Sequence, residues 1–257
     1  MMDEKNLKHE IEFFDAFWAP HSQQLGFNAE VFNKFYADPR AVWDPLQRVS
    51  MLLGNLSGTR MLDMGCGMGE EALYFAKLGA HVTAIDISPV GVEITRNRAA
   101  YNGVADRVEA ILGRADATGL ADRSFDIVHG LGVLHHIDLE RGVKEAKRLL
   151  RPGGKAVFFE HMGNSPLIEK LKPILYGKST AAHYSEGERP LRWQDVASCI
   201  EEFPVKAMYP YHFVTRLRGK WPRLGNESFL KLDYNILRVF PLLRYFAGGA
   251  LIYFEAP

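Results

Sequence analysis

The sequence predicts a doubly wound α/β fold: a mostly parallel, seven-stranded sheet with N-terminal helices and an inserted segment near the end of the chain. Two observations support this fold class. Between residues 60 and 160, short apolar strands alternate with helices, which is typical of a parallel sheet covered on both faces. The 257 residues are 47% hydrophobic and 24% charged, an ordinary globular composition, so we expect one domain with additions.

The N-terminal part is expected to be helical. Apolar residues at helical spacing predict helices over residues 7–19 and 43–56. We assign residues 1–57 to an N-terminal helical cap.

The central part, residues 58–162, is expected to hold the ligand-binding core. Its predicted strands are Arg60–Met64, His81–Asp86, Val108–Arg114, Phe125–Gly130 and Lys155–Glu160. Its predicted helices cover residues 70–78, 89–102 and 139–150. Gly79 is suited to end the first of these helices, and Ser88-Pro89 to begin the second.

The pattern changes in the last part, residues 163–257. Residues 163–192 are rich in Gly, Pro, Ser and His and resemble a loop. Beyond them we predict a helix over 193–202, a strand over 205–213, a helical stretch over 226–246 and a strand over Ala250–Phe254. The two strands are expected to form an antiparallel edge of the sheet.

Composition excludes several classes of protein. Lys and Arg number 31, as do Asp and Glu, and this balance argues against nucleic-acid binding. Two cysteines, Cys66 and Cys199, exclude a disulfide scaffold and a cysteine-based metal cluster, and we expect no metal. The charged start is no secretory signal, and the longest apolar run has nine residues, Phe246–Phe254, so a cytoplasmic location is expected.

The strongest functional signal is a glycine-rich turn, Asp63-Met64-Gly65-Cys66-Gly67-Met68-Gly69, between a predicted strand and a predicted helix. Glycines there let the backbone turn tightly and approach a ligand that a Cβ would block. About twenty residues later Asp86 ends the next strand, where a carboxylate can accept hydrogen bonds from both hydroxyls of a ribose. A plain structural turn is the alternative, but the combination favours a bound nucleoside.

Two acidic residues indicate which nucleoside this is. Asp63 precedes the first glycine, and Glu70 begins the helix. Both would repel the pyrophosphate that dinucleotide sites hold at a helix N-terminus. They suit a ligand with a cationic end, and S-adenosylmethionine, which carries a sulfonium and an α-ammonium, fits better than NAD.

Residues 60–160 resemble the class I S-adenosylmethionine-dependent methyltransferases, in particular bacterial small-molecule methyltransferases, whose core is Rossmann-like. The motifs that carry the resemblance follow one another in order: Asp63–Gly69, Asp86, Gly113-Arg114-Ala115-Asp116-Ala117, Ser124–Val128 and Leu149–Lys155. The resemblance implies that Asp116 takes the adenine amino group and that the Ala117 amide faces the ring, although an aspartate after a strand also commonly forms a turn. The implied cofactor contacts are Asp63, Gly65, Cys66, Gly67, Gly69, Asp86, Ile87, Asp116, Ala117, Gly130 and Leu131.

Candidates for the chemistry lie at the ends of the fourth and fifth strands. Methyl transfer needs alignment and exclusion of water, and a general base helps when a hydroxyl or an ammonium must lose a proton. His136 is our first candidate for such a base and His135 the second, although both histidines suit a structural role equally well. Glu160 can orient a substrate or a histidine, or cap a loop.

The acceptor is expected to be a small molecule methylated on oxygen or nitrogen, such as a natural product, a sugar or a glycan or lipid intermediate. Candidate substrate-binding residues are Trp18, His161, His183 and Tyr184. Residues 204–244 hold eight Lys and Arg against two acids. This basic part suits an anionic acceptor, peripheral contact with a membrane or simply a solvated face.

Two alternatives stay open on the sequence alone. The chain can bind S-adenosylmethionine without transferring methyl, as a cyclase-type scaffold or a regulatory module. It can also be an NAD(P)-dependent oxidoreductase, which Asp63 and the Asp116 motif disfavour. The sequence does not indicate an oligomeric state.

Overall fold

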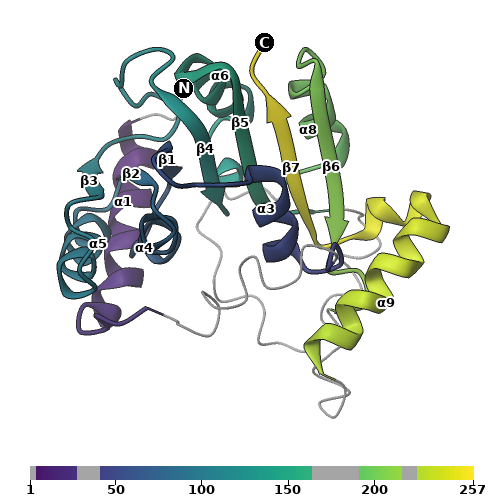
Figure 1. Ribbon diagram of the computed structural model, residues 1–257, viewed down its shortest axis with the longest axis horizontal. Helices are drawn as coiled ribbons and strands as arrows, with labels where there is room; N and C mark the ends of the chain where they lie inside the picture. The colour runs from purple at the N-terminus through teal and green to yellow at the C-terminus, as the bar shows by residue number, and fades with distance from the viewer. Residues whose placement is uncertain (1–3, 28–40, 164–190, 216–224) are drawn as a thin grey trace.

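The computed structural model describes residues 4–27, 41–163, 191–215 and 225–257 (Figure 1). Its helices are α1 (Glu4–Trp18), η1 (Ala19–His21), α3 (Pro45–Leu53), α4 (Glu70–Lys77), α5 (Pro89–Tyr101), η2 (Leu134–His136), α6 (Leu139–Leu149), α8 (Trp193–Cys199), α9 (Asn226–Val239) and η5 (Pro241–Phe246). Its strands are β1 (Arg60–Met64), β2 (His81–Asp86), β3 (Val108–Leu112), β4 (Phe125–Leu131), β5 (Leu150–His161), β6 (Val205–Tyr211) and β7 (Gly249–Glu255).

The seven strands form one sheet in the order β3-β2-β1-β4-β5-β7-β6. The first five strands of the chain run parallel, as the alternation of strands and helices predicted. The prediction that the last two strands form an antiparallel edge is confirmed, since β6 and β7 pair antiparallel at the end of the strand order. Only β7 runs antiparallel, and it lies between β5 and β6, so that the edge strand β6 has the same direction as β5. The chain leaves β6 and enters β7 at the same end of the sheet, which requires opposite directions.

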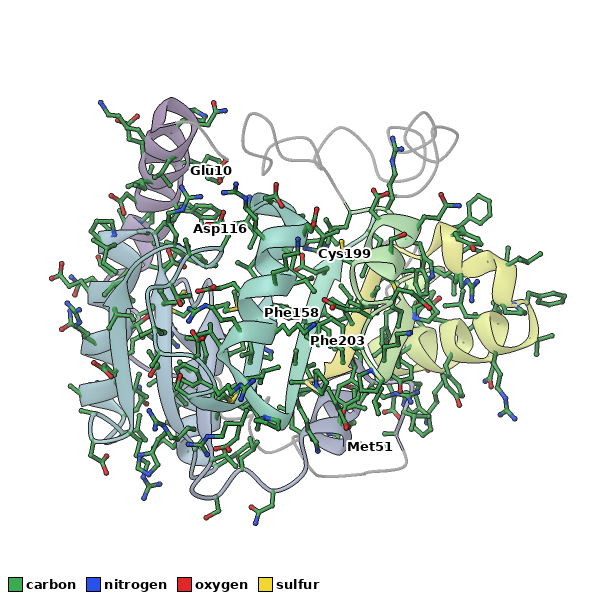
Figure 2. The ribbon with its side chains drawn as sticks, turned by 90° about the horizontal axis from the view of Figure 1, so that it is seen from above. Glu10, Met51, Asp116, Phe158, Cys199 and Phe203 are labelled. Atoms are coloured by element: carbon green, nitrogen blue, oxygen red, sulfur yellow. The ribbon has the colours of Figure 1, made fainter. Side chains whose placement is uncertain are left out.

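Helices cover both faces of the sheet. Along each strand, successive side chains point to opposite faces, so Met61 packs in a core with α3 and α4 while Leu62 packs in a second core with α6 and α8. Figure 2 shows Phe158 and Phe203 inside this second core, whereas Met51 lies on the outer side of α3. The alternation places Asp63 on the same face as Met61.

The described helices differ in detail from the prediction. The helical stretch expected over 226–246 is two elements, α9 and η5, because Pro241 cannot continue a helix and the preceding Phe240 leaves the helical region (φ −119°, ψ 74°). Gly79, with φ of 98°, follows α4, and the Ser88 hydroxyl caps α5 by accepting a hydrogen bond from the Gly91 N–H (2.9 Å). In the described ranges, no helix has the length and apolar character needed to cross a membrane.

Candidate functional site

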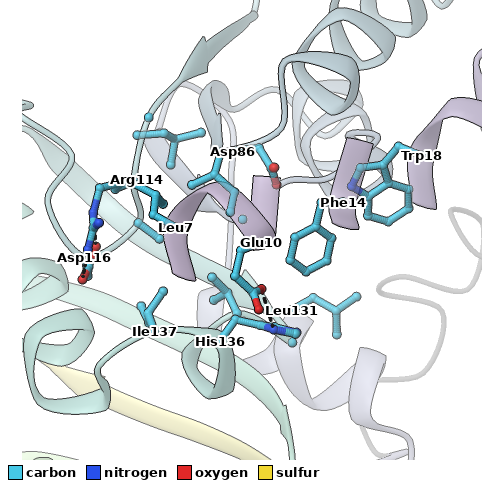
Figure 3. Close-up of a pocket in the computed structure, with 17 residues that line it drawn as sticks. Leu7, Glu10, Phe14, Trp18, Asp86, Arg114, Asp116, Leu131, His136 and Ile137 are labelled. Atoms are coloured by element: carbon cyan, nitrogen blue, oxygen red, sulfur yellow. Dashed lines mark hydrogen bonds and ion pairs between the residues drawn. The ribbon is translucent and has the colours of Figure 1, made fainter. Parts of the chain in front are cut away.

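A cavity of about 110 Å³ lies at the carboxyl ends of β1, β2 and β4. The order of the strands reverses between β1 and β4, and ligands of open α/β sheets bind at such a point. Three parts of the chain form the wall: helix α1, the ends of β1 to β3 with the following loops, and the loop after β4 (Figure 3). Of the residues predicted to contact a ligand, Trp18, Gly65, Asp86, Ile87, Asp116, Leu131 and His136 line this cavity.

Close packing explains the glycines of the turn after β1. Gly67 has φ of 50°, and a Cβ on it would lie 2.5 Å from Cζ2 of Trp18. Gly65 has φ of 71°, and its Cβ would lie 2.7 Å from Cγ2 of Val133. Both the left-handed backbone and the space therefore require glycine at these positions. The turn brings α1 and the loop after β4 against the end of β1.

Asp86 connects the turn to the second strand. One oxygen of its carboxylate accepts a hydrogen bond from the Gly67 N–H (2.8 Å), and the other accepts one from the Ser88 N–H (2.8 Å). Burial raises the pKa of Asp86, although the two hydrogen bonds act in the opposite direction. The carboxylate is fixed in the cavity wall, and its remaining lone pairs suit the hydroxyls of a ribose.

Asp116 lies in the same wall with a partner that the sequence reasoning missed. The Arg114 guanidinium donates two hydrogen bonds to its carboxylate, at 2.9 and 2.8 Å. Arg114 lines the cavity too. These two hydrogen bonds fix the orientation of the Asp116 carboxylate. Each of its oxygens keeps a lone pair that can accept a hydrogen bond from an amino group. With Ile85 and Ile87 as apolar surfaces, the donor and acceptor set fits an adenosine.

Helix α1 covers this cavity with Leu7, Glu10, Phe14 and Trp18 (Figure 3). Next to these side chains on α1, the Asp15 carboxylate accepts hydrogen bonds from the Ser88 hydroxyl (2.5 Å) and the Val90 N–H (3.2 Å). The sequence reasoning missed Asp15 and Glu10, since nothing local distinguishes them from other acids on a helix.

The two neighbouring histidines of η2 have different surroundings. His135 is buried, and its Nδ1 lies 2.7 Å from Oε2 of Glu160. The other Glu160 oxygen accepts hydrogen bonds from the N–H groups of Val133 (3.0 Å) and Leu134 (2.8 Å). Glu160 therefore clamps the loop after β4, and His135 is outside the cavity wall. His136 lines the cavity, with its Nδ1 3.5 Å from Oε2 of Glu10 and its ring edge-on to Phe14.

The remaining predicted residues lie elsewhere. His161 is exposed at the end of β5, with its ring centroid 5.7 Å from that of His135. His183 and Tyr184 lie outside the described residues. The other expected cofactor contacts stand behind or beside the cavity wall: Asp63, Cys66, Gly67, Gly69, Ala117 and Gly130. Glu70, expected to suit a ligand with a cationic end, forms an ion pair with the buried Arg98.

A second cavity, of about 250 Å³, also lies at the carboxyl ends of the strands, on the face of the sheet that α3 and α4 cover. Its wall is formed by Pro45, Leu46, Val49, Glu70, Glu71, Tyr74, Phe75, His129, Leu131, Phe159 and His212. Of these residues, the sequence indicates Leu131 as a cofactor contact and Glu70 as an acid suited to a cationic ligand. Groups of three or more His, Cys, Asp or Glu side chains placed to hold a metal are absent from the part of the chain that the structure describes.

A family model described as a methyltransferase domain matches residues 62–158. A demethylmenaquinone methyltransferase of Chlorobaculum tepidum is 32% identical over 181 residues, which are 68% of this chain and 67% of the relative. A 27-O-demethylrifamycin SV methyltransferase of Amycolatopsis mediterranei is 42% identical over 112 residues, 42% of this chain and 40% of the relative. The chain spans 34% to 66% of the length of four curated relatives, the rifamycin enzyme among them.

The fold is also similar to that of solved structures. The phosphoethanolamine N-methyltransferase 2 of Haemonchus contortus, in complex with S-adenosyl-L-methionine, superposes with a TM-score of 0.61. The match covers 95% of this chain and 60% of that chain at 15% identity, so it shows a common fold.

Proposed function

Because this chain belongs to the class I S-adenosylmethionine-dependent methyltransferases, we propose that it transfers a methyl group to an oxygen or nitrogen atom of a small-molecule acceptor. The observation that carries the proposal is the cavity in which Asp86, Asp116 and the turn at Gly65 meet. These groups come from three neighbouring parallel strands and their loops. Asp86 would provide a carboxylate for the ribose and Asp116 one for the adenine. The tight turn at Gly65 lies beside them.

The residues that would hold the cofactor have separate tasks. Asp86 would accept hydrogen bonds from the ribose hydroxyls, and Asp116, held by Arg114, would accept one from the adenine amino group. Ile87 would contact the adenine face. S-adenosylmethionine supplies, when bound, a methyl carbon already activated by a sulfonium.

The chain contributes alignment and exclusion of water. Helix α1 places the apolar side chains of Leu7, Phe14 and Trp18 over the cavity. The Glu160 clamp fixes the loop that carries His136. Of His135 and His136, only His136 lines the cavity and could contact a ligand there. His135 contacts Glu160 and would help to position the loop.

The acceptor is proposed from the names of two relatives and from the wall of the second cavity. Those names refer to demethylmenaquinone and to 27-O-demethylrifamycin SV. The wall is mostly apolar, so it would suit an acceptor with an apolar surface. The division into a cap (1–57), a cofactor-binding core (58–162) and an acceptor-binding part with the sheet edge (163–257) stays a prediction. The wall of the second cavity would come mainly from the first two parts, with His212 from the third.

Calorimetric titration tests this proposal. The purified protein is titrated with S-adenosylhomocysteine, and NADH serves as a parallel control. We expect micromolar binding of S-adenosylhomocysteine and none of NADH. Binding of NADH alone would overturn the proposed function. With an acceptor in hand, S-adenosylmethionine that remains unconsumed during turnover would indicate the non-methylating alternative.

A further inference from the structure

The second cavity adjoins the first. Leu131, at the end of β4, lines both, and Glu70 and Glu71 begin the helix that follows the glycine-rich turn. The second cavity therefore continues from the expected cofactor site along the α3 and α4 face of the sheet. Its position suits a molecule that must meet the reactive end of the cofactor.

His129 lines this second cavity and is paired with a buried acid, Asp63. Asp63 on β1 and His129 on β4 are directly paired in the parallel ladder, and both side chains point to the α4 face. Nδ1 of His129 lies 3.0 Å from Oδ1 of Asp63. Asp63 is 2% exposed and His129 4%, so the pair is shielded from bulk water. Phe75 packs edge-on against the imidazole, with 4.9 Å between the ring centroids.

This pairing fixes the histidine for proton transfer. A carboxylate that binds Nδ1 sets the tautomer in which Nδ1 carries the hydrogen and Nε2 is the free acceptor. The imidazole lines the cavity, so Nε2 is the nitrogen left for a ligand there. The negative charge of Asp63 would stabilise the imidazolium once Nε2 has taken a proton.

We propose that the second cavity binds the methyl acceptor, that the acceptor is a flat, mostly apolar ring carrying a hydroxyl group, and that His129, held by Asp63, is the general base that accepts the hydroxyl proton. This inference rests on the proposed function. In the step, the O–H bond breaks, the proton moves to Nε2 of His129, and the electron pair stays on the acceptor oxygen. That oxygen would then form a bond to the methyl carbon of bound S-adenosylmethionine. The carbon–sulfur bond would break, its electron pair would stay on sulfur, and S-adenosylhomocysteine would be the leaving group.

The wall of the second cavity favours a flat, apolar ring as its ligand. Its apolar and aromatic side chains are Leu46, Val49, Tyr74, Phe75, Leu131 and Phe159. They come from α3, α4, β4 and β5, so they enclose a ligand from several sides. Such a surface gains free energy by covering an apolar ring and offers little to a sugar or a phosphate.

The polar groups of the cavity favour a neutral hydroxyl over an ammonium. Groups facing His129 are Asp63 from β1, Glu70 and Glu71 from α4, and His212, which follows β6. Glu70 is already neutralised by Arg98. Burial, with a contribution from Asp63, raises the pKa of Glu71 to about 7, so near neutral pH this carboxyl is partly protonated. Burial also raises the pKa of Tyr74, which stays uncharged.

The first experiment blocks the cavity and measures binding of 2-naphthol, a flat ring with one hydroxyl, in the presence of saturating S-adenosylhomocysteine. Val49→Trp places a bulky ring in the cavity wall, and Met51→Trp places the same ring on the outer side of the same helix (Figure 2). We expect at least tenfold weaker binding of 2-naphthol to Val49→Trp and no change for Met51→Trp. Titration with S-adenosylhomocysteine is expected to be unchanged in both variants.

The outcomes separate this inference from the proposed function. Equal binding of 2-naphthol by the unmodified protein and Val49→Trp, or its failure to bind the unmodified protein, overturns the acceptor cavity. Parallel loss of S-adenosylhomocysteine binding in Val49→Trp also overturns it, because the cavity then holds the amino-acid end of the cofactor. Failure of S-adenosylhomocysteine to bind the unmodified protein overturns the proposed function as well.

The second experiment tests the base. His129→Asn keeps an N–H group near Asp63 and lacks a counterpart of Nε2. The ionisation of bound 2-naphthol is followed by its absorbance as a function of pH. We expect bound 2-naphthol to ionise at a lower pH in the unmodified protein than in His129→Asn, with affinity for S-adenosylhomocysteine retained. The same ionisation midpoint in both proteins overturns the assignment of His129.

Discussion

The carboxylate of Asp15 accepts a hydrogen bond from the hydroxyl of Ser88, 73 residues later in the chain. Ser88 is also the cap of α5, and the Val90 N–H donates to the same Asp15 oxygen. One acid on α1 thus satisfies the first turn of α5, where a negative charge is favoured by the free N–H groups. This contact holds α1 over the cavity assigned to the cofactor.

Removal of this contact is expected to weaken cofactor binding. Asp15→Ala should lower the affinity for S-adenosylhomocysteine roughly tenfold, because hydrogen bonds to a charged group contribute about 1.5–3 kcal/mol. Titration calorimetry measures the change. Glu12→Ala removes an exposed acid from the same helix and should leave the affinity unchanged. Equal affinities of the Asp15→Ala variant and the unmodified protein would show that α1 does not close the site.

Gly67→Ala tests the close packing of the turn. The new methyl group would meet the Trp18 ring, so we expect α1 to be displaced and S-adenosylhomocysteine to bind at least tenfold more weakly. Gly103→Ala is the matched control, since Gly103 also has positive φ (67°) but has open space around it. It should cost roughly 1–2 kcal/mol of stability and leave the affinity intact. Equal loss of affinity in the two variants would contradict the role of Trp18.

Glu71→Gln is expected to change how stability depends on pH. The pKa of Glu71 is about 7 in the folded protein and 4.5 as its ordinary value, so the folded state binds this proton more tightly. The folded protein therefore loses stability as pH rises from about 4.5 to 7, with the full cost, on the order of 3 kcal/mol, present above that range.

Urea unfolding at several pH values checks this expectation. The advantage of Glu71→Gln over the unmodified protein should grow as pH rises through this range and stay constant above it. Glu109→Gln, an exposed position on β3, should show no such trend. A stability difference that does not vary with pH would show that folding does not raise the pKa of Glu71.

Glu160→Gln should weaken the clamp on the loop after β4. The carboxylate accepts hydrogen bonds from two backbone N–H groups and faces His135, and it is fully buried. The amide of Gln has one oxygen where the carboxylate has two, so it can accept only some of these hydrogen bonds. We therefore expect the free energy of unfolding to fall by roughly 2–4 kcal/mol. Urea unfolding measures it. A loss below about 0.5 kcal/mol would show that the loop does not depend on Glu160.

Much of the fold follows from local signals. The bounds of β1 and β2 were predicted to the residue, because each is a buried apolar run with a glycine turn or a helix cap after it. The place of β7 could not be predicted, since strand order depends on contacts between segments far apart in the chain. The same holds for the break between α9 and η5, where the apolar pattern continues across Pro241.

The candidate site also contains residues that local sequence indicates and residues that it does not. The residues at the ends of β1 and β2 are recognisable from spacing, and Gly65 and Asp86 lie in the cavity wall. The pair of Asp63 and His129 depends on the register of two strands 66 residues apart, which no local pattern shows. The partner of Asp116, Arg114, lies two residues away in the same motif, but the motif does not show that the two side chains meet.

Leu131 has a consequence for how two ligands would bind together. Its side chain forms part of both cavities, so an occupant of one can reshape the wall of the other. Binding free energies at two sites are linked reciprocally. The factor by which the nucleoside changes the affinity for the acceptor equals the factor by which the acceptor changes the affinity for the nucleoside. A substitution at Leu131 that alters this factor would therefore alter it equally in both directions.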